Sequence, residues 1–267
     1  MKINIDVNTA EFKRAMGVAE SQVKYAASRA INAVAEKGQK AVQAEMRKVF
    51  DRPTEWVINS LRLKRSSKAQ TKLEAEVAFK DRNSAESSRT MVEPHVVGGS
   101  RRFKAMEARL RGIGMLPAGW FVVPGAAAKL DANGNMSRGQ ISQVLNVLGS
   151  YTEAGFNKAN INTVRRLAKG GLKSSQYGQF GFTYWVNPVG GKRSGRLLPG
   201  VYQRVQTGFG SSLKPVMVFV KSTSYKKRLD FYGIVQRTAD ASLSTEFTSA
   251  FNEAMRTARF SQQGSLL

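Results

Sequence analysis

Cysteine is absent from this chain of 267 residues, and histidine occurs once, as His95. Without cysteine there is no disulfide, no thiolate metal site and no cysteine nucleophile, a composition that suits a reducing cytoplasm. A single histidine also excludes a metal site with two histidine ligands. We expect His95 to be a partly buried, hydrogen-bonding residue of a loop rather than a catalytic group.

Long apolar segments are missing too. No stretch of the sequence approaches the roughly 20 apolar residues that span a bilayer. The first residues, MKINIDVNTAEFKR, contain no apolar core of the kind found in a signal peptide. We therefore expect a soluble protein that has no membrane contact and is not exported by a signal peptide.

Acidic residues are scarce relative to basic ones. There are 19 Asp and Glu against 42 Lys and Arg, which gives a formal charge of +23. Solubility rarely needs so much charge of one sign, so the excess indicates a polyanion or an acidic surface as partner. The 42% of hydrophobic residues is enough for a real core, and the chain is expected to fold.

Hydrophobic periodicity predicts a long helix at each end of the chain. After a strand at 2–7, Asn8 and Glu11 form a capping box for a helix that reaches Phe50. The narrow apolar stripe of this helix is as consistent with packing in the core as with a subunit interface. A final amphipathic helix is expected from about 225 to 260.

Strands and short helices are predicted between the two long helices. Alternating apolar and polar residues predict a half-exposed strand at 73–79, and Ser137 with Gln140 caps a helix that Gly149 closes. Further strands are predicted at 119–124, 182–187, 200–206 and 216–221, with a loop at 207–215, and further helices at 54–60, 101–111 and 160–168.

This order of elements indicates an α+β fold, in which the long N-terminal and C-terminal helices pack on a mostly antiparallel sheet. We expect one domain that spans residues 1–267. Loop-rich insertions, with some helix, are expected at about 81–118 and at 150–181.

Motifs for enzyme chemistry are incomplete. The run that begins at Asp131 resembles a calcium loop but has Met136 where glycine is required and Ser142 where glutamate is required, so a tight turn before Ser137 is expected. The run 190–195 lacks the first glycine and the Ser/Thr of a phosphate loop, so a basic turn is expected there.

Glu74 and Glu76 lie on one face of the predicted strand, as the paired carboxylates of a nuclease or glycosidase would. Lys72 and Lys80 continue the same face, which favours solvated positions over a catalytic pair. We therefore assign no catalytic, cofactor-binding or metal-binding residue, and we expect that the protein is not an enzyme and has no cofactor.

The basic residues form clusters along the whole chain, which argues against a single recognition helix. Clustered Lys and Arg suit contacts with DNA phosphates without sequence preference, and they suit an acidic protein partner equally well. The candidates for contact with DNA or a partner are Arg62, Lys64 and Arg65; Arg101, Arg102 and Lys104; Arg165 and Arg166; Lys192, Arg193 and Arg196; and Lys226, Lys227 and Arg228. Lys68 and Lys169 extend two of these clusters.

Several segments resemble a group of bacteriophage and prophage virion proteins. They are the runs AEMRKVFDRPT at 44–54, GGSRRFK at 98–104, LPAGW at 116–120 and DANGNMSRGQI at 131–141, together with the region from LPGVYQR at 198–204 to the last helix. The group comprises minor tail or tail-completion proteins similar to the minor tail protein Z family. The likeness covers most of the chain, although these motifs carry structural glycines, prolines and arginines and define no chemistry.

The resemblance implies a structural protein of the virion, at the neck or tail, that is assembled in the host cytoplasm. Such a head-tail connector component docks with portal or connector proteins and with tail proteins, as a homo-oligomeric ring of roughly six or twelve copies. Its basic residues are candidates for non-specific contact with genomic DNA in the channel. The alternative from the charge alone is a sequence-independent nucleic-acid-binding protein of a mobile element.

Overall fold

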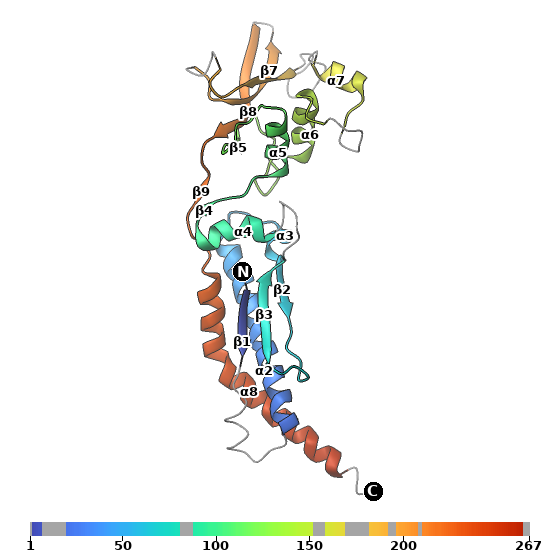
Figure 1. Ribbon diagram of the computed structural model, residues 1–267, viewed down its shortest axis with the longest axis vertical. Coiled ribbons are helices and arrows are strands. Elements are labelled where there is room, and N and C mark those ends of the chain that lie inside the picture. The colour runs from blue at the N-terminus through green and yellow to red at the C-terminus, as the bar shows by residue number, and fades with distance from the viewer. Residues whose placement is uncertain are drawn as a thin grey trace. The chain divides into compact units, whose positions relative to one another are not determined.

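The chain folds into two compact units, each with its own buried hydrophobic cluster. The terminal unit comprises Met1–Gly98 and Lys226–Leu267, and the central unit comprises Gly99–Tyr225. The computed structural model describes residues 2–6, 20–80, 88–151, 158–168, 182–191, 196–207 and 210–263. The expected single α+β domain is therefore built as two units, and helices and antiparallel sheets occur in both (Figure 1).

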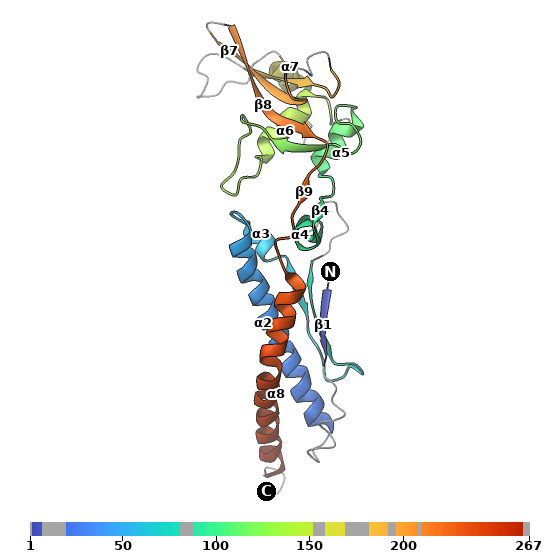
Figure 2. The same cartoon turned by 90° about the vertical axis from the view of Figure 1, so that its left-hand side faces the viewer.

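The terminal unit combines two long helices with a small antiparallel sheet. The helices α2 and α8 run side by side (Figures 1 and 2) and pack against each other, and α2 also packs on β3. In the sheet the strand order is β1-β3-β2. The elements of this unit are β1 (Lys2–Asp6), α2 (Glu20–Val49), α3 (Glu55–Ile58), β2 (Leu61–Lys64), β3 (Glu74–Phe79), α4 (Ser88–Val97) and α8 (Phe231–Gln263).

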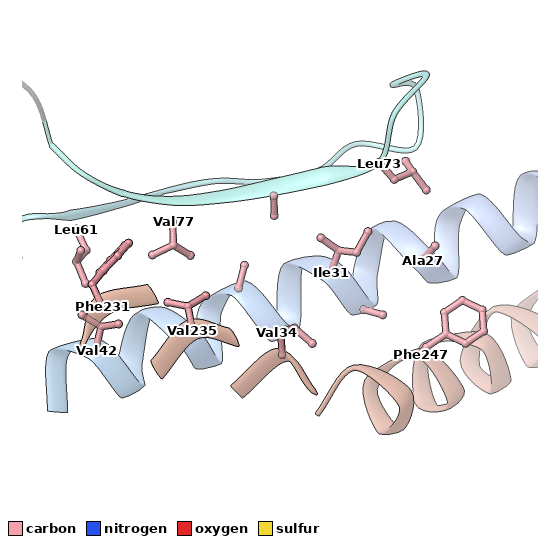
Figure 3. Close-up of a cluster of buried hydrophobic side chains, with 14 of the residues drawn as sticks. Ala27, Ile31, Val34, Val42, Leu61, Leu73, Val77, Phe231, Val235 and Phe247 are labelled. Atoms are coloured by element: carbon pink, nitrogen blue, oxygen red, sulfur yellow. The ribbon is translucent and has the colours of Figure 1, made fainter. Parts of the chain in front are cut away.

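The core of the terminal unit confirms the predicted apolar stripes of both long helices. On α2 the stripe is made largely of alanine, and Val34 is fully buried; on α8 the buried side chains include Phe231 and Val235. Figure 3 shows Val77 of β3 pointing from the sheet toward these helices. Burying one such side chain contributes about 1.5–3 kcal/mol. Gly38 of α2 lies against Val235, where a Cβ atom would already be 3.4 Å from Cγ1.

Three expectations for this unit need correction. The strand at 73–79 is not half-exposed, because β3 is the central strand and Glu76 and Ala78 are buried on its second face. The loop-rich stretch expected from about 81 contains the helix α4, which was not predicted. His95 consequently lies on α4, not in a loop.

The last helix begins later than its apolar pattern indicates. It starts at Phe231 instead of 225, because Asp230 occupies the position before its first turn: the side chain accepts a hydrogen bond from the backbone N–H of Gly233 at 3.3 Å. Residues 224–225 form β9, which pairs with β4. The first residues of the predicted N-terminal helix lie outside the described residues, and α2 confirms that helix from Glu20 to Val49.

The central unit is built on a four-stranded antiparallel sheet of order β5-β8-β7-β6, and α5 and α6 contribute Leu110, Val144 and Leu145 to its core. The prediction of a loop at 207–215 is wrong, because β8 already begins at Gly210; the Gly, Ser and Pro residues of this segment obscure its strand pattern in the sequence. The elements are β4 (Gly99–Ser100), α5 (Ala105–Gly112), β5 (Phe121–Pro124), α6 (Arg138–Val147), α7 (Ile161–Ala168), β6 (Phe182–Asn187), β7 (Gly200–Thr207), β8 (Gly210–Val220) and β9 (Ser224–Tyr225).

The turn before α6 confirms the interpretation of the calcium-like run. Oδ1 of Asp131 accepts hydrogen bonds from the backbone N–H groups of Asn133 at 2.9 Å and Asn135 at 2.8 Å, and Gly134 has a φ of 80°. Ser137 caps α6 by accepting a hydrogen bond from the N–H of Gln140 at 3.3 Å. The basic turn expected at 190–195 lies for its greater part outside the described residues.

Candidate polyanion-binding surface

The positive charge of the protein is concentrated in the central unit. Residues 99–225 contain 18 Lys and Arg but 3 Asp and Glu, a formal charge of +15. The terminal unit contains 24 basic and 16 acidic residues, a charge of +8 on a slightly longer stretch of chain. Basic clusters occur along the whole chain, as expected, but the net charge is distributed unevenly, because acidic residues accompany the basic ones mainly in the terminal unit.

Few carboxylates compensate the cations of the central unit. Glu107 is completely buried, and Asp131 holds its own turn together. The third, Glu153, lies outside the described residues. Against the one exposed carboxylate that the structure describes in this unit, there are eleven exposed cations: Arg102, Lys104, Arg109, Lys129, Arg138, Lys158, Arg165, Arg196, Arg204, Lys214 and Lys221.

The terminal unit differs in kind, because many of its described carboxylates pair with cations. Arg47 lies 2.7 Å from Glu55, and Arg65 lies 2.7 Å from Glu36. Lys37 contacts Glu246 of α8 at 2.6 Å. Exposed pairs of this sort contribute little to stability, at about 0–1 kcal/mol each, but they offset part of the positive charge of this unit.

Three cations of the central unit, Arg109, Arg111 and Lys221, lie over aromatic rings, and the exposed Arg102 and Lys104 flank Phe103 in the sequence. We call this the basic–aromatic surface; it consists of Arg102, Phe103, Lys104, Arg109, Arg111, Trp120, Tyr151 and Lys221. The guanidinium carbon of Arg111 lies 3.3 Å from the ring centroid of Phe103, and that of Arg109 lies 4.7 Å from the centroid of Tyr151. Lys221 Nζ is 5.7 Å from the centroid of Trp120. Cations over aromatic faces are held in place by the ring quadrupole.

A buried ion pair fixes the backbone that carries this surface. Nη2 and Nη1 of Arg101 donate to Glu107, at 2.6 and 2.9 Å, and the carboxylate also accepts from the backbone N–H of Lys104 at 2.8 Å and of Val122 at 2.7 Å. Glu107 thus links the start of α5 to β5. Burial acts to raise the pKa of Glu107, but the hydrogen bonds from Arg101 and the two N–H groups outweigh it, and the pKa lies below its ordinary value.

Arg111 makes a second link between α5 and β5. Its Nη2 donates to the carbonyl oxygen of Trp120 at 2.8 Å, beside the contact with Phe103. Phe103 in turn stacks on Phe121, with ring centroids 4.9 Å apart. Phe103 is 37% exposed, so its ring is accessible at the edge of this arrangement. Arg109 and Arg111 therefore lie on α5, whereas Phe103 and Trp120 lie just outside α5 and β5 and are tied to them by these contacts.

The structure separates the predicted contact residues into three groups. Arg101 is buried against Glu107 and has a structural role, and Arg62 and Arg65 are occupied by Glu76 and Glu36. Exposed positions are held by Lys64, Arg102, Lys104, Arg165, Arg196, Lys226, Lys227 and Arg228. Lys192, Arg193 and the side chain of Arg166 lie outside the described residues.

Arg109, Arg111 and Lys221 are not among the contact residues predicted from the sequence. A signal for the first two was present, since 101–111 was expected to be a basic helical stretch. Lys221 gave no such signal, because only the pairing of Phe121 with Val220 brings the end of β8 beside Trp120. The charge imbalance of 99–225 is visible in the sequence only once the boundaries of this unit are known.

A shallow polar groove occurs between α2 and α8 of the terminal unit, lined by Arg29, Glu36, Arg65, Glu246 and Glu253. Its carboxylates are engaged: Glu253 contacts Arg29 at 2.9 Å, and the other two are paired as described above. Glu76 is likewise paired, with Arg62 at 2.7 Å, so it is not the solvated position that was expected. The arrangement compensates charge within the unit and presents no unmatched anion or cation to a substrate.

Among the described residues, no group of three or more histidine or acidic side chains is arranged to hold a metal ion. None of the helices that the structure describes is both long and apolar enough to cross a membrane. In comparisons with known proteins, neither a family model nor a curated protein nor a solved structure matches this chain.

Proposed function

We propose that this chain is a non-enzymatic structural protein of a bacteriophage virion, a tail-completion, neck or minor tail component of the head–tail junction. The sequence support is the resemblance of several segments, 98–104 and 116–120 among them, to minor tail and tail-completion proteins. The structural observation that carries the proposal is the division of charge: a unit of +8 with several ion pairs, and a unit of +15 whose described part exposes one carboxylate. This division suits a protein that binds other proteins with one part and lies beside the genome with the other.

The terminal unit is the candidate for protein contacts within a ring and with portal, connector or tail proteins. In a closed ring, each copy presents one surface to one neighbour and a different surface to the other. Large apolar side chains are exposed on this unit: Trp56 is 53% exposed, Tyr232 44% and Val97 63%. Exposed aromatic side chains such as Trp56 and Tyr232 often become the buried anchors of an interface between proteins.

The proposal is tested on the phage whose genome encodes the chain. We expect the protein in purified virions by mass spectrometry, and we expect deletion of its gene to leave filled heads and separate tails that do not join. Complementation from a plasmid should restore infectious particles. Virions that lack the protein, or a deletion with normal particle yield and infectivity, would contradict the proposal.

The second candidate, a sequence-independent nucleic-acid-binding protein of a mobile element, is favoured by the +15 charge of the central unit. It predicts a protein that is found with nucleic acid in the host cell and is missing from virions. The same mass spectrometry of purified particles and of host lysate therefore distinguishes the two candidates.

A further inference from the structure

We infer that the central unit binds duplex DNA through its sugar–phosphate backbone, without reading sequence, and that the basic–aromatic surface is part of the contact. The identification of that DNA with the phage genome rests on the proposed function, whereas the binding itself does not. The inference assigns DNA contact to one unit of the chain and to named side chains, in place of a charge spread over the whole molecule.

Charge density is the first argument. A folded unit of this length has a radius of gyration of about 14 Å, so a duplex that crosses it lies beside it for about 30 Å. Over that length DNA carries about 18 phosphate charges. The +15 of the central unit is of the same order, and eleven of its cations are exposed in the part that the structure describes.

The kind of side chain present is the second argument. A surface that binds an acidic protein is expected to carry charges of both signs around an apolar centre, because interfaces between proteins are depleted of charge at their core. The described part of the central unit exposes one carboxylate, Asp131, and that group is used in its own turn. A uniformly cationic surface matches a uniformly anionic polymer better than it matches a protein.

The geometry of the basic–aromatic surface is the third argument. Arg109 extends over Tyr151 and Lys221 over Trp120, so both cations are directed by a ring before any contact forms. Ordered cations lose less side-chain entropy when they bind phosphate. The helix that carries Arg109, α5, has eight residues and begins at Ala105, and no recognition helix with base-reading side chains is built there. Backbone contact without sequence preference follows from this arrangement.

The experiment measures binding of the full-length protein to labelled duplexes of about 30 bp with two unrelated sequences, by fluorescence anisotropy at about 50–300 mM KCl. The test variant carries Arg102→Gln, Lys104→Gln, Arg109→Gln and Lys221→Gln. The control variant carries Lys40→Gln, Lys64→Gln, Lys68→Gln and Arg256→Gln, four exposed cations of the terminal unit, and has the same net charge as the test variant.

We expect the wild type to bind both duplexes equally, with log affinity falling linearly with log salt concentration. Each lost phosphate contact reduces the magnitude of that negative slope by about 0.9. The slope of the test variant should therefore be shallower by about 3 to 4, and its affinity at 100 mM KCl should be at least about tenfold weaker. The control variant should retain the wild-type slope to within about 1. Circular dichroism and thermal melting check that both variants are folded.

A second central-unit variant, Lys129→Gln with Arg138→Gln and Arg204→Gln, keeps the inference testable if the first variant does not fold, and its slope should fall by about 2 to 3. Equal losses in the test and control variants would show that only total charge matters and would overturn the assignment to the central unit. If the wild-type protein bound poly-L-glutamate but neither duplex, the choice of DNA over an acidic protein as the ligand would be overturned. These assays test DNA binding alone, so a negative result does not contradict the proposed virion function. Likewise, absence of the protein from virions does not contradict DNA binding by the central unit.

Discussion

Replacing Glu107 with Gln is expected to destabilise the central unit more than any other single change of charge. The carboxylate is completely buried and accepts four hydrogen bonds, two from Arg101 and one each from the N–H groups of Lys104 and Val122. In Glu107→Gln one oxygen becomes an NH₂ group, which then faces N–H donors. Arg101, with a side chain only 11% exposed, would keep its charge without a counter-ion.

The expected cost is about 3–5 kcal/mol in the free energy of unfolding, because one partner of a buried ion pair is removed while the other remains. With a urea dependence of about 2 kcal/mol per molar for a unit of this size, the midpoint should fall by about 1.5–2.5 M. Since hydrogen bonds keep the folded pKa of Glu107 below its ordinary value, the ionised form stabilises the fold above the pKa of the unfolded chain. This stabilisation is lost as the pH falls through the lower folded pKa, and the glutamine variant should lack that acid-dependent loss.

The assay is urea unfolding followed by tryptophan fluorescence in a Trp56→Phe background, because the other two tryptophans, Trp120 and Trp185, both belong to the central unit. Glu76→Gln is the matched control in the terminal unit, and its unfolding is followed by circular dichroism, which reports the long helices α2 and α8 of that unit. Its partner Arg62 has a side chain 55% exposed and can be hydrated, so a loss of about 1 kcal/mol is expected. Glu107→Gln with an unchanged midpoint, or a loss no larger than that of Glu76→Gln, would refute the reasoning.

Three further substitutions test the packing and protonation of the fold. Gly200→Ala should lower the free energy of unfolding by about 1–3 kcal/mol or more, because a Cβ atom would collide with the carbonyl oxygen of Met217 on the paired strand. Urea unfolding measures this loss, and a variant as stable as the wild type would contradict the strand register. Phe231→Ala should cost about 3–5 kcal/mol in terminal-unit stability, since this ring is fully buried 5.1 Å from that of Phe79, and a loss below about 1 kcal/mol would argue against the packing. Burial, and to a smaller extent the nearby Arg228, lowers the pKa of His95, so the fold favours the neutral imidazole and stability should fall as the pH drops below about 6.5. In thermal melts, His95→Gln should reduce this loss of stability at low pH. A variant whose melting temperature depends on pH as that of the wild type does would contradict the reasoning.

Elements with a strong local pattern were predictable from the sequence. The stripe of small apolar residues on α2 and the Ser137 cap of α6 each depend on residues within one or two turns of helix, and both are confirmed. The α+β class follows from the same signals, since long helices at the ends and alternating strands between them allow few other arrangements.

Features that depend on distant partners were not predictable. Glu76 reads as a polar residue on the outer face of a strand, and only the pairing of β3 between β1 and β2, with Arg62 opposite, shows that it is buried. Arg101 reads as a surface cation for the same reason, although its partner Glu107 is on the next helix. The basic–aromatic surface needs the β5–β8 pairing to bring Lys221 to Trp120, and no local pattern contains that information.

The most direct test of the account is a cryo-electron microscopy reconstruction of the head–tail junction in virions of the encoding phage. The account predicts a closed ring of this chain between portal and tail proteins, with the central unit, residues 99–225, toward the DNA in the channel. A junction without this chain, or a ring in which the central unit lies away from the DNA and the channel lining is acidic, would contradict it.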